Sequence, residues 1–125
     1  MNVVYDAGVL VAAARSAREI WADHRVRLEA GVVPVTTAPV VAQVSRAPRQ
    51  VQLRRFLRGC DVMAFTAEEA HEVGSLLGDA GLSDVVDAHV VRVAEKLGAS
   101  VLTADVRDLS RLAEHVPGDI PVVPL

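Results

Sequence analysis

The sequence has little of what stabilises or anchors several common classes of protein. A single cysteine, Cys60, among 125 residues excludes an internal disulfide framework and fits a reducing compartment. Aromatic residues make up only 3% of the chain, so the core must be mainly aliphatic. The uncharged stretch 32–45 is too short, and too broken by proline, to span a bilayer. No basic segment precedes an apolar run near the start, so we expect no secretory signal and a cytoplasmic protein.

The chain also lacks the motifs of several enzyme classes. It has no G-x-S-x-G nucleophile elbow, no glycine-rich phosphate loop and no dinucleotide fingerprint. Its histidines are scattered without the spacing of a zinc site: His24, His71, His89 and His115. Cys60 has no histidine close in sequence, and we interpret it as a small buried hydrophobe. These absences leave the acidic residues as the main candidates for chemistry.

Charge is divided unevenly between the two parts of the chain. Residues 1–60 hold nine arginines and four acidic residues, whereas residues 61–125 hold four basic and twelve acidic residues. The whole chain carries a net charge of −3, and this value hides the contrast. A basic face beside an acidic pocket suits a polyanion that arginines bind and present to a metal. The alternative is that the arginines are solvated or face an acidic protein.

Apolar runs and turn residues predict alternating strands and helices. The expected strands are 3–5, 32–37, 60–65, 100–103 and an edge strand within 120–125. The expected helices follow Asp6, cover 17–30, begin at Pro39, and cover 49–58, 66–77, 84–97 and 106–115, with a turn at 78–81. The pattern predicts an α/β fold in which a central parallel sheet of four to five strands is flanked by helices on both faces.

Five aspartates lie where a strand leads into a helix or in the first turn of a helix. They are Asp6, Asp84, Asp87, Asp105 and Asp108. Such turns in a parallel sheet open on one edge, where ligands collect, so these carboxylates are expected to converge. Carboxylates that converge repel one another, and a hard divalent cation such as Mg²⁺ relieves the repulsion.

Helix capping is the competing explanation for most of these aspartates. Asp6, Asp84 and Asp105 each stand where a side-chain oxygen can accept a hydrogen bond from a free N–H group. Asp108 could be a solvated acid of a first turn. Capping does not explain Asp87, which lies further inside an apolar helix and needs a partner to offset its desolvation.

Three segments carry a resemblance to a known family. They are VVYDAGVLVAA, TTAPVVAQV and LSDVVDAHVVRVAEKLGASVLTADVRDL, and the most specific part links Asp87 to Asp105. Together they resemble a PIN-domain ribonuclease and, more narrowly, the VapC toxin of bacterial VapBC toxin–antitoxin pairs. The resemblance covers nearly the whole chain and implies a single PIN domain over residues 1–125.

The resemblance implies a Mg²⁺- or Mn²⁺-dependent endoribonuclease, the toxin of a type II toxin–antitoxin system. Carried over by position, Asp6 matches the first acid of the family, Asp87 the third and Asp105 the fourth, as metal-binding and catalytic residues. Asp84 and Asp108 are expected in supporting positions. The implied partners are an RNA substrate such as tRNA or rRNA, a VapB-like antitoxin and a second copy of the chain in a homodimer.

The second acid of the family is missing. The pattern V-x-x-E-V is VVAQV here, so Gln43 stands where a glutamate is usual. Losing a charge about 4 Å from a cation is worth on the order of 4 kcal/mol at an effective dielectric near 20. The alternative function is therefore a catalytically weak PIN fold that binds RNA or protein. A phospho-acceptor receiver domain is disfavoured because Asp6 stands alone after its strand and the only lysine, Lys96, lies in an expected helix.

Overall fold

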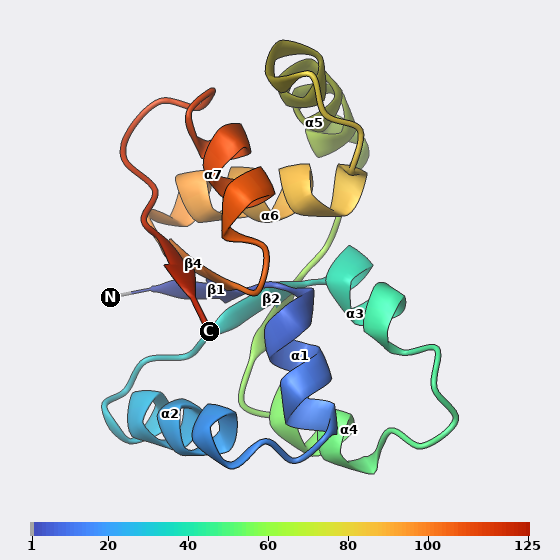
Figure 1. Ribbon diagram of the computed structural model, residues 1–125, viewed down its shortest axis with the longest axis vertical. Coiled ribbons are helices and arrows are strands. Elements are labelled where there is room, and N and C mark those ends of the chain that lie inside the picture. Colours follow the sequence, from blue (N-terminus) through green and yellow to red (C-terminus); the bar gives the residue numbers. More distant parts are fainter. Residues whose placement is uncertain (1) are drawn as a thin grey trace.

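The computed structural model describes residues 2–125, along which strands and helices alternate (Figure 1). The strands are β1 (Val3–Tyr5), β2 (Val35–Thr37), β3 (Asp61–Met63), β4 (Ser100–Thr103) and β5 (Val122–Pro124). The helices are α1 (Ala7–Ala14), α2 (Arg18–Glu29), α3 (Ala38–Val44), α4 (Val51–Leu57), α5 (Ala67–Ala80), α6 (Val85–Leu97) and α7 (Val106–Ala113).

The five strands form one parallel sheet in the order β3-β2-β1-β4-β5. The predicted parallel α/β fold is confirmed. The chain moves outward from β1 through β2 to β3 on one side, and then returns to β4 on the other side of β1. The order therefore reverses between β1 and β4, and the carboxyl ends of these two strands flank the crevice where ligands of such sheets bind.

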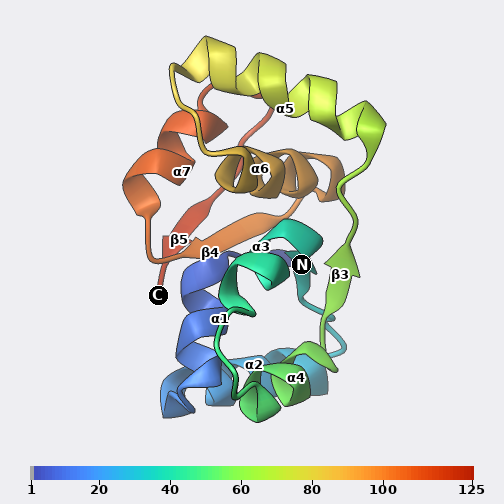
Figure 2. The same ribbon diagram turned by 90° about the vertical axis from the view of Figure 1, so that its right-hand side faces the viewer.

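Helices cover both faces of the sheet. Figures 1 and 2 show α1, α2 and α4 on one side, and α5, α6 and α7 on the other. Valine, leucine and alanine dominate the buried side chains, as the low aromatic content predicts. Among residues 2–125, no helix is both long enough and apolar enough to cross a membrane.

Three of the four aromatic residues gather on the α2–α4 side of the sheet. The Phe56 ring stacks on His24 with ring centroids 4.0 Å apart, and it contacts Tyr5 and Trp21 at 5.6 and 5.1 Å. Arg27 donates a hydrogen bond to the hydroxyl oxygen of Tyr5 at 3.2 Å, so that hydroxyl proton is free to point to Nδ1 of His24, 3.0 Å away. This aromatic cluster (Tyr5, Trp21, His24 and Phe56) joins α2 and α4 to the central strand β1.

Acidification is expected to weaken this cluster. Burial is the largest cause that lowers the pKa of His24 below its ordinary value of 6.5, so the folded protein holds the ring neutral. The unfolded chain takes up a proton as the pH falls below about 6.5, whereas the folded chain resists it. The free energy of unfolding should therefore decrease as the pH drops through that range.

Urea unfolding of wild type and His24→Asn at a series of pH values checks this expectation. Asparagine keeps a hydrogen-bond acceptor for Tyr5 but does not titrate, so its unfolding free energy should depend less on pH between about 7 and 5. Equal slopes in the two proteins would contradict the assignment of a neutral, buried His24.

Two boundaries differ by three residues from the sequence-based prediction. The turn predicted over residues 78–81 is wrong, because α5 continues through Gly78 to Ala80 and ends at Gly81, whose φ is +67°. A glycine inside a helix is tolerated at a modest cost, whereas the left-handed conformation that ends a helix favours glycine strongly. Strand β2 begins at Val35 instead of Val32.

Candidate functional site

Asp6 follows β1 directly and is buried, with 4% of its surface exposed. It occupies the N-cap position of α1, but within residues 2–125 its side chain makes no capping hydrogen bond. Its Oδ2 instead accepts a hydrogen bond from Oγ1 of Thr103 at 2.6 Å, and its Oδ1 is buried without a partner in the described part of the chain. Capping therefore does not account for Asp6, and one of its oxygens remains available to a ligand.

Thr103 connects the ends of the two strands that flank the crevice. This fully buried residue ends β4, and besides donating to Asp6 its Oγ1 accepts a hydrogen bond from the backbone N–H of Asp105 at 2.9 Å. A hydroxyl can donate once and accept as well, so one side chain orients both segments.

The aspartates at the start of α6 and α7 divide into caps and other residues. Asp84 Oδ1 accepts from the backbone N–H of Asp87 at 3.0 Å, and Asp105 Oδ1 accepts from that of Asp108 at 3.3 Å. Asp84 and Asp105 are therefore N-caps, as the competing explanation proposed, and both are exposed. Capping uses one carboxylate oxygen of Asp105 and leaves the other available.

Three carboxylates come together at this edge of the sheet. One oxygen each from Asp87, Asp105 and Asp108 lie within 4.8 Å of one another, a spacing that suits oxygen ligands around a divalent cation. Asp108, expected only in support, is thus a member of this group. Asp6 lies outside this three-residue group, but its charge acts on Asp87.

Asp87 is the most perturbed acid of the site. Burial is the largest cause that raises its pKa to about 7. The other causes are the neighbouring negative charges of Asp84, Asp6, Asp105 and Asp108. A cation in this crevice would remove the repulsion and favour the ionised form, so its binding should release a proton and strengthen as the pH rises towards 7.

The residues present fit a hard divalent ion. The donors are carboxylate oxygens, and one of them is buried without a partner among residues 2–125. The pKa of Asp87 is raised to about 7, first by burial and then by the neighbouring carboxylates that a cation would neutralise. Helix α3 adds no carboxylate: its Gln43 has an exposed side chain, and its backbone carbonyl accepts from Nε of Arg46 at 3.2 Å. The site therefore relies on acids that follow β1 and β4 and on those that begin α6 and α7.

Gly8 controls how closely α1 approaches the segment after β4. A Cβ atom added to Gly8 would lie 2.7 Å from Cβ of Ala104, which is too close for any real contact. Ala104 stands between Thr103 and Asp105, so this contact sets the spacing of the two sides of the crevice. Reasoning from the sequence missed this role, although a glycine two residues after a candidate ligand was a signal for it.

Gly8→Ala should destabilise the protein by about 1–3 kcal/mol, because the new methyl group must displace Ala104. It should also weaken divalent-ion binding, since Asp105 moves with that segment. Gly74→Ala is the matched control: nothing lies within 4 Å of its added Cβ, so in the interior of α5 it should stabilise by about 0.5–1 kcal/mol. Thermal unfolding and metal titration of both variants test the difference, and equal effects would contradict the role of Gly8.

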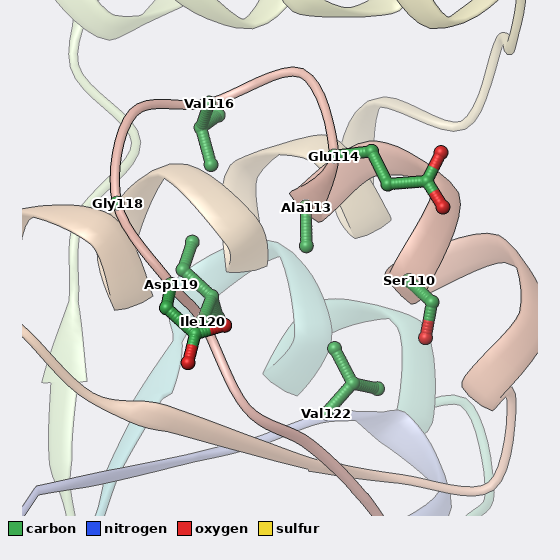
Figure 3. A pocket seen from close by; sticks show the side chains of 8 residues that line it. All are labelled: Ser110, Ala113, Glu114, Val116, Gly118, Asp119, Ile120 and Val122. Atoms are coloured by element: carbon green, nitrogen blue, oxygen red, sulfur yellow. The ribbon is translucent and has the colours of Figure 1, made fainter.

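Other hollows of the surface do not gather these acids. Figure 3 shows one between α7 and the segment that leads into β5, and its carboxylates Glu114 and Asp119 lie on opposite sides. A pair of acids that do not converge offers no shared ligand set to a cation. The convergent carboxylates therefore remain the candidate site.

Comparison with solved structures agrees with this fold. The chain is similar over its full length to a chain of VapBC2 from Rickettsia felis, in a crystal structure of VapBC2 bound to a DNA fragment from their promoter. That match has a TM-score of 0.73 and 17% identity, and covers 100% of this chain and 99% of that one. The chain is also similar to PAE2754 from Pyrobaculum aerophilum, with a TM-score of 0.62 and 23% identity. This match covers 98% of this chain and 92% of the PAE2754 chain. A comparison with curated protein sequences finds no match.

A family model matches nearly the whole chain. The model is that of the PIN domain, and it matches residues 3–115, which include every aspartate of the crevice. PIN domains are generally nucleases, and PIN nucleases generally use divalent metal ions. The convergent carboxylates, the reversed strand order and this match have one consequence: the chain belongs to the PIN domain family.

Proposed function

We propose that the chain is a Mg²⁺- or Mn²⁺-dependent endoribonuclease that acts as the toxin of a type II toxin–antitoxin pair. The observation that carries the proposal is the set of acids at the carboxyl ends of β1 and β4, where Asp6 keeps a buried oxygen without a partner among residues 2–125. Asp87, Asp105 and Asp108 converge beside it. We assign metal binding and catalysis to Asp6, Asp87 and Asp105, and add Asp108 to the ligand set.

The chain's residues divide the work of phosphodiester hydrolysis. A divalent ion supplies an activated water and neutralises charge on the phosphate when it is bound. Asp87 offers an oxygen that is ionised once the ion is present, because its pKa of about 7 falls when the repulsion is removed. Thr103 fixes Asp6 and the backbone of Asp105, so the donors are oriented before the substrate arrives.

The proposed partners of this chain are an antitoxin, an RNA substrate and a second copy of the chain. The full-length likeness to a chain of VapBC2 supports a VapB-like antitoxin as the inhibitor of this chain. The arginines of residues 1–60 support a polyanionic substrate, for which structured RNA such as tRNA or rRNA is proposed. A homodimer completes the proposal.

Gln43 favours a second candidate function. Gln43 supplies no charge where the family usually has its second acid, so the site would bind its ion more weakly, and the chain would then bind RNA or protein without efficient cleavage. A glutamine offers an amide oxygen but no charge, which lowers the attraction for the cation. This alternative predicts that a glutamate at position 43 creates activity that the natural residue does not support.

Cleavage of a mixed pool of tRNA and rRNA with Mg²⁺ or Mn²⁺ separates the two functions. Wild type should cleave, and Asp6→Asn should lower the rate at least about a hundredfold, because a buried charge that would face the ion is lost. Asp119→Asn is the matched control, since this exposed aspartate lies outside the crevice and should leave the rate unchanged. Full activity in Asp6→Asn would contradict the site, and an inert wild type with an active Gln43→Glu would favour the binding module.

A further inference from the structure

We propose that a pocket between α2 and α4 is a second RNA-contact site, distinct from the carboxylate crevice. Trp21 forms an aromatic surface for one unpaired base, and Arg18, Arg25 and Arg55 bind the adjoining phosphates. The inference rests on the proposed function in one respect: RNA is the polyanion that this protein meets as its substrate.

The pocket is built from two helices and has the size of a nucleotide site. Its volume is about 430 Å³, which lies within the range of small-molecule pockets. Trp21, Arg18 and Arg25 come from α2, and Gln52 and Arg55 come from α4. The lining thus combines one aromatic ring, three arginine guanidinium groups that donate hydrogen bonds, and one side-chain amide group.

The Trp21 ring is held in place before any ligand arrives. Its Nε1 donates a hydrogen bond to the backbone carbonyl of Ala13 at 3.0 Å. Its ring packs edge-to-face on Phe56, with a centroid distance of 5.1 Å, and on His24 at 6.4 Å. The only polar atom of the side chain is therefore satisfied, and the part that lines the pocket is aromatic surface. A fixed aromatic ring is a stacking platform that accepts any base.

The arginines of the pocket form no ion pair in the described part of the chain. Within residues 2–125, the ion pairs of the protein involve His89, Arg92 and Lys96, and none includes Arg18, Arg25 or Arg55. All three pocket arginines are exposed. Each guanidinium presents donors in a planar fork that matches two phosphate oxygens. A base stacked on the Trp21 ring and phosphates bound by the arginine guanidinium groups would together account for both parts of a nucleotide.

The pocket lies at the opposite end of α1 from the carboxylates. Asp6 precedes the first residue of α1, and Ser16, two residues beyond its last, lines the pocket. Helix α1 runs from the sheet towards α2 and α4 (Figure 1). Its eight residues span about 12 Å, so an RNA strand bound at the carboxylates could reach the pocket by following α1. A neighbouring hollow shares Gln52 and adds Arg49 and Arg54, which extends the basic surface.

Fluorescence of Trp21 tests the site directly, because the chain has only one tryptophan. A mixed-sequence single-stranded RNA oligonucleotide is titrated into wild type in EDTA, which prevents metal-dependent cleavage. We expect saturable quenching that weakens about tenfold or more in Arg25→Ala/Arg55→Ala, and a shallower dependence of binding on salt. Lys96→Ala/Arg111→Ala, which removes the same number of positive charges at exposed residues outside the pocket, should bind as wild type does.

The remaining outcomes separate this inference from the ribonuclease assignment. With Mg²⁺, the pocket variant should raise KM for long RNA about tenfold without changing kcat, and should cleave an oligonucleotide too short to reach Trp21 as wild type does. Arginine-dependent quenching in a protein that cleaves no RNA would support the pocket and overturn the assignment. Cleavage without such quenching would overturn the pocket alone. Quenching by polyglutamate but not by RNA would overturn it in favour of an acidic protein segment.

Discussion

Asp87→Asn should abolish metal-dependent RNA cleavage and, in metal-free buffer, make the protein more stable than wild type. The two effects have one cause. Burial and neighbouring carboxylates raise the pKa of Asp87 to about 7, so a charge at this position is costly until a cation arrives. Asparagine removes the charge that the ion needs and also the repulsion that the metal-free protein suffers.

The sizes of the two effects follow from the charge of Asp87 and from the shift of its pKa. Removing one charge about 4 Å from a cation costs on the order of 4 kcal/mol, or about a thousandfold in metal affinity. The stability gain is smaller. A shift from 3.8 to about 7 would correspond to about 4 kcal/mol if the group were dry. Because Asp87 is only half-buried and solvent screens its charge, we expect about 1–2 kcal/mol.

The pH dependence gives the sign of the effect. A carboxyl whose pKa is raised on folding loses stability as the pH rises from its unfolded value of 3.8 through about 7. The stability gain of Asp87→Asn should therefore be largest above pH 7 and vanish below about pH 4. Thermal unfolding in EDTA measures it, and isothermal titration with Mn²⁺ measures the lost binding.

Asp84→Asn is the matched control for this experiment. Asp84 precedes the same helix, carries the same charge and is exposed, and asparagine preserves its capping hydrogen bond. It should change metal affinity far less than Asp87→Asn. A metal-free Asp87→Asn protein that is less stable than wild type above pH 7 would show that Asp87 is not repelled in the folded state.

Phe56→Ala should have the largest effect on stability, a loss of about 3–5 kcal/mol. Phe56 is fully buried and contacts each other member of the aromatic cluster. Its removal would leave a cavity between α4, α2 and β1. The loss is large because the whole free energy of unfolding of a domain of this size is only about 5–15 kcal/mol. Urea unfolding should show a much lower midpoint with a similar slope.

Phe56→Leu separates the cavity from the loss of aromatic contacts. Leucine is closer in volume and should cost less than half as much as alanine, because it fills more of the space. Val62→Ala, an exposed site on the edge strand β3, should change stability by less than about 0.5 kcal/mol. Similar losses in Phe56→Ala and Val62→Ala would mean that the cluster does not hold the α2–α4 side to the sheet.

Local sequence signals predicted the fold where side-chain pattern and burial agree. The apolar run before Asp6 became β1, and the run that ends at Thr103 became β4, because each is buried on both faces of a parallel sheet. The predicted end of α5 is too early because the sequence alone does not distinguish Gly78, which lies inside the helix, from Gly81, which ends it. Only the backbone shows that Gly81 adopts the left-handed region and ends the helix.

The sequence was enough to predict which edge of the sheet holds the site, but not to predict every residue that belongs to the site. That aspartates after parallel strands converge follows from topology, and the odd position of Asp87 followed from its apolar neighbours. Asp108 was expected only in support because sequence spacing does not specify which way a first-turn side chain turns. The contact between Gly8 and Ala104 joins distant segments and leaves no periodic trace in the sequence.

The hydrogen bond between Thr103 and Asp6 spans 97 positions of the chain, and this separation determines when the site comes into existence during synthesis. Strand β1 leaves the ribosome before its neighbour β4, which is made only after α6. A growing chain that ends before β4 holds Asp6 without Thr103, Asp105 or Asp108, and so lacks most of the crevice. Any activity of the crevice is therefore delayed until β4 and the start of α7 have been made, even if the helices before them have already formed.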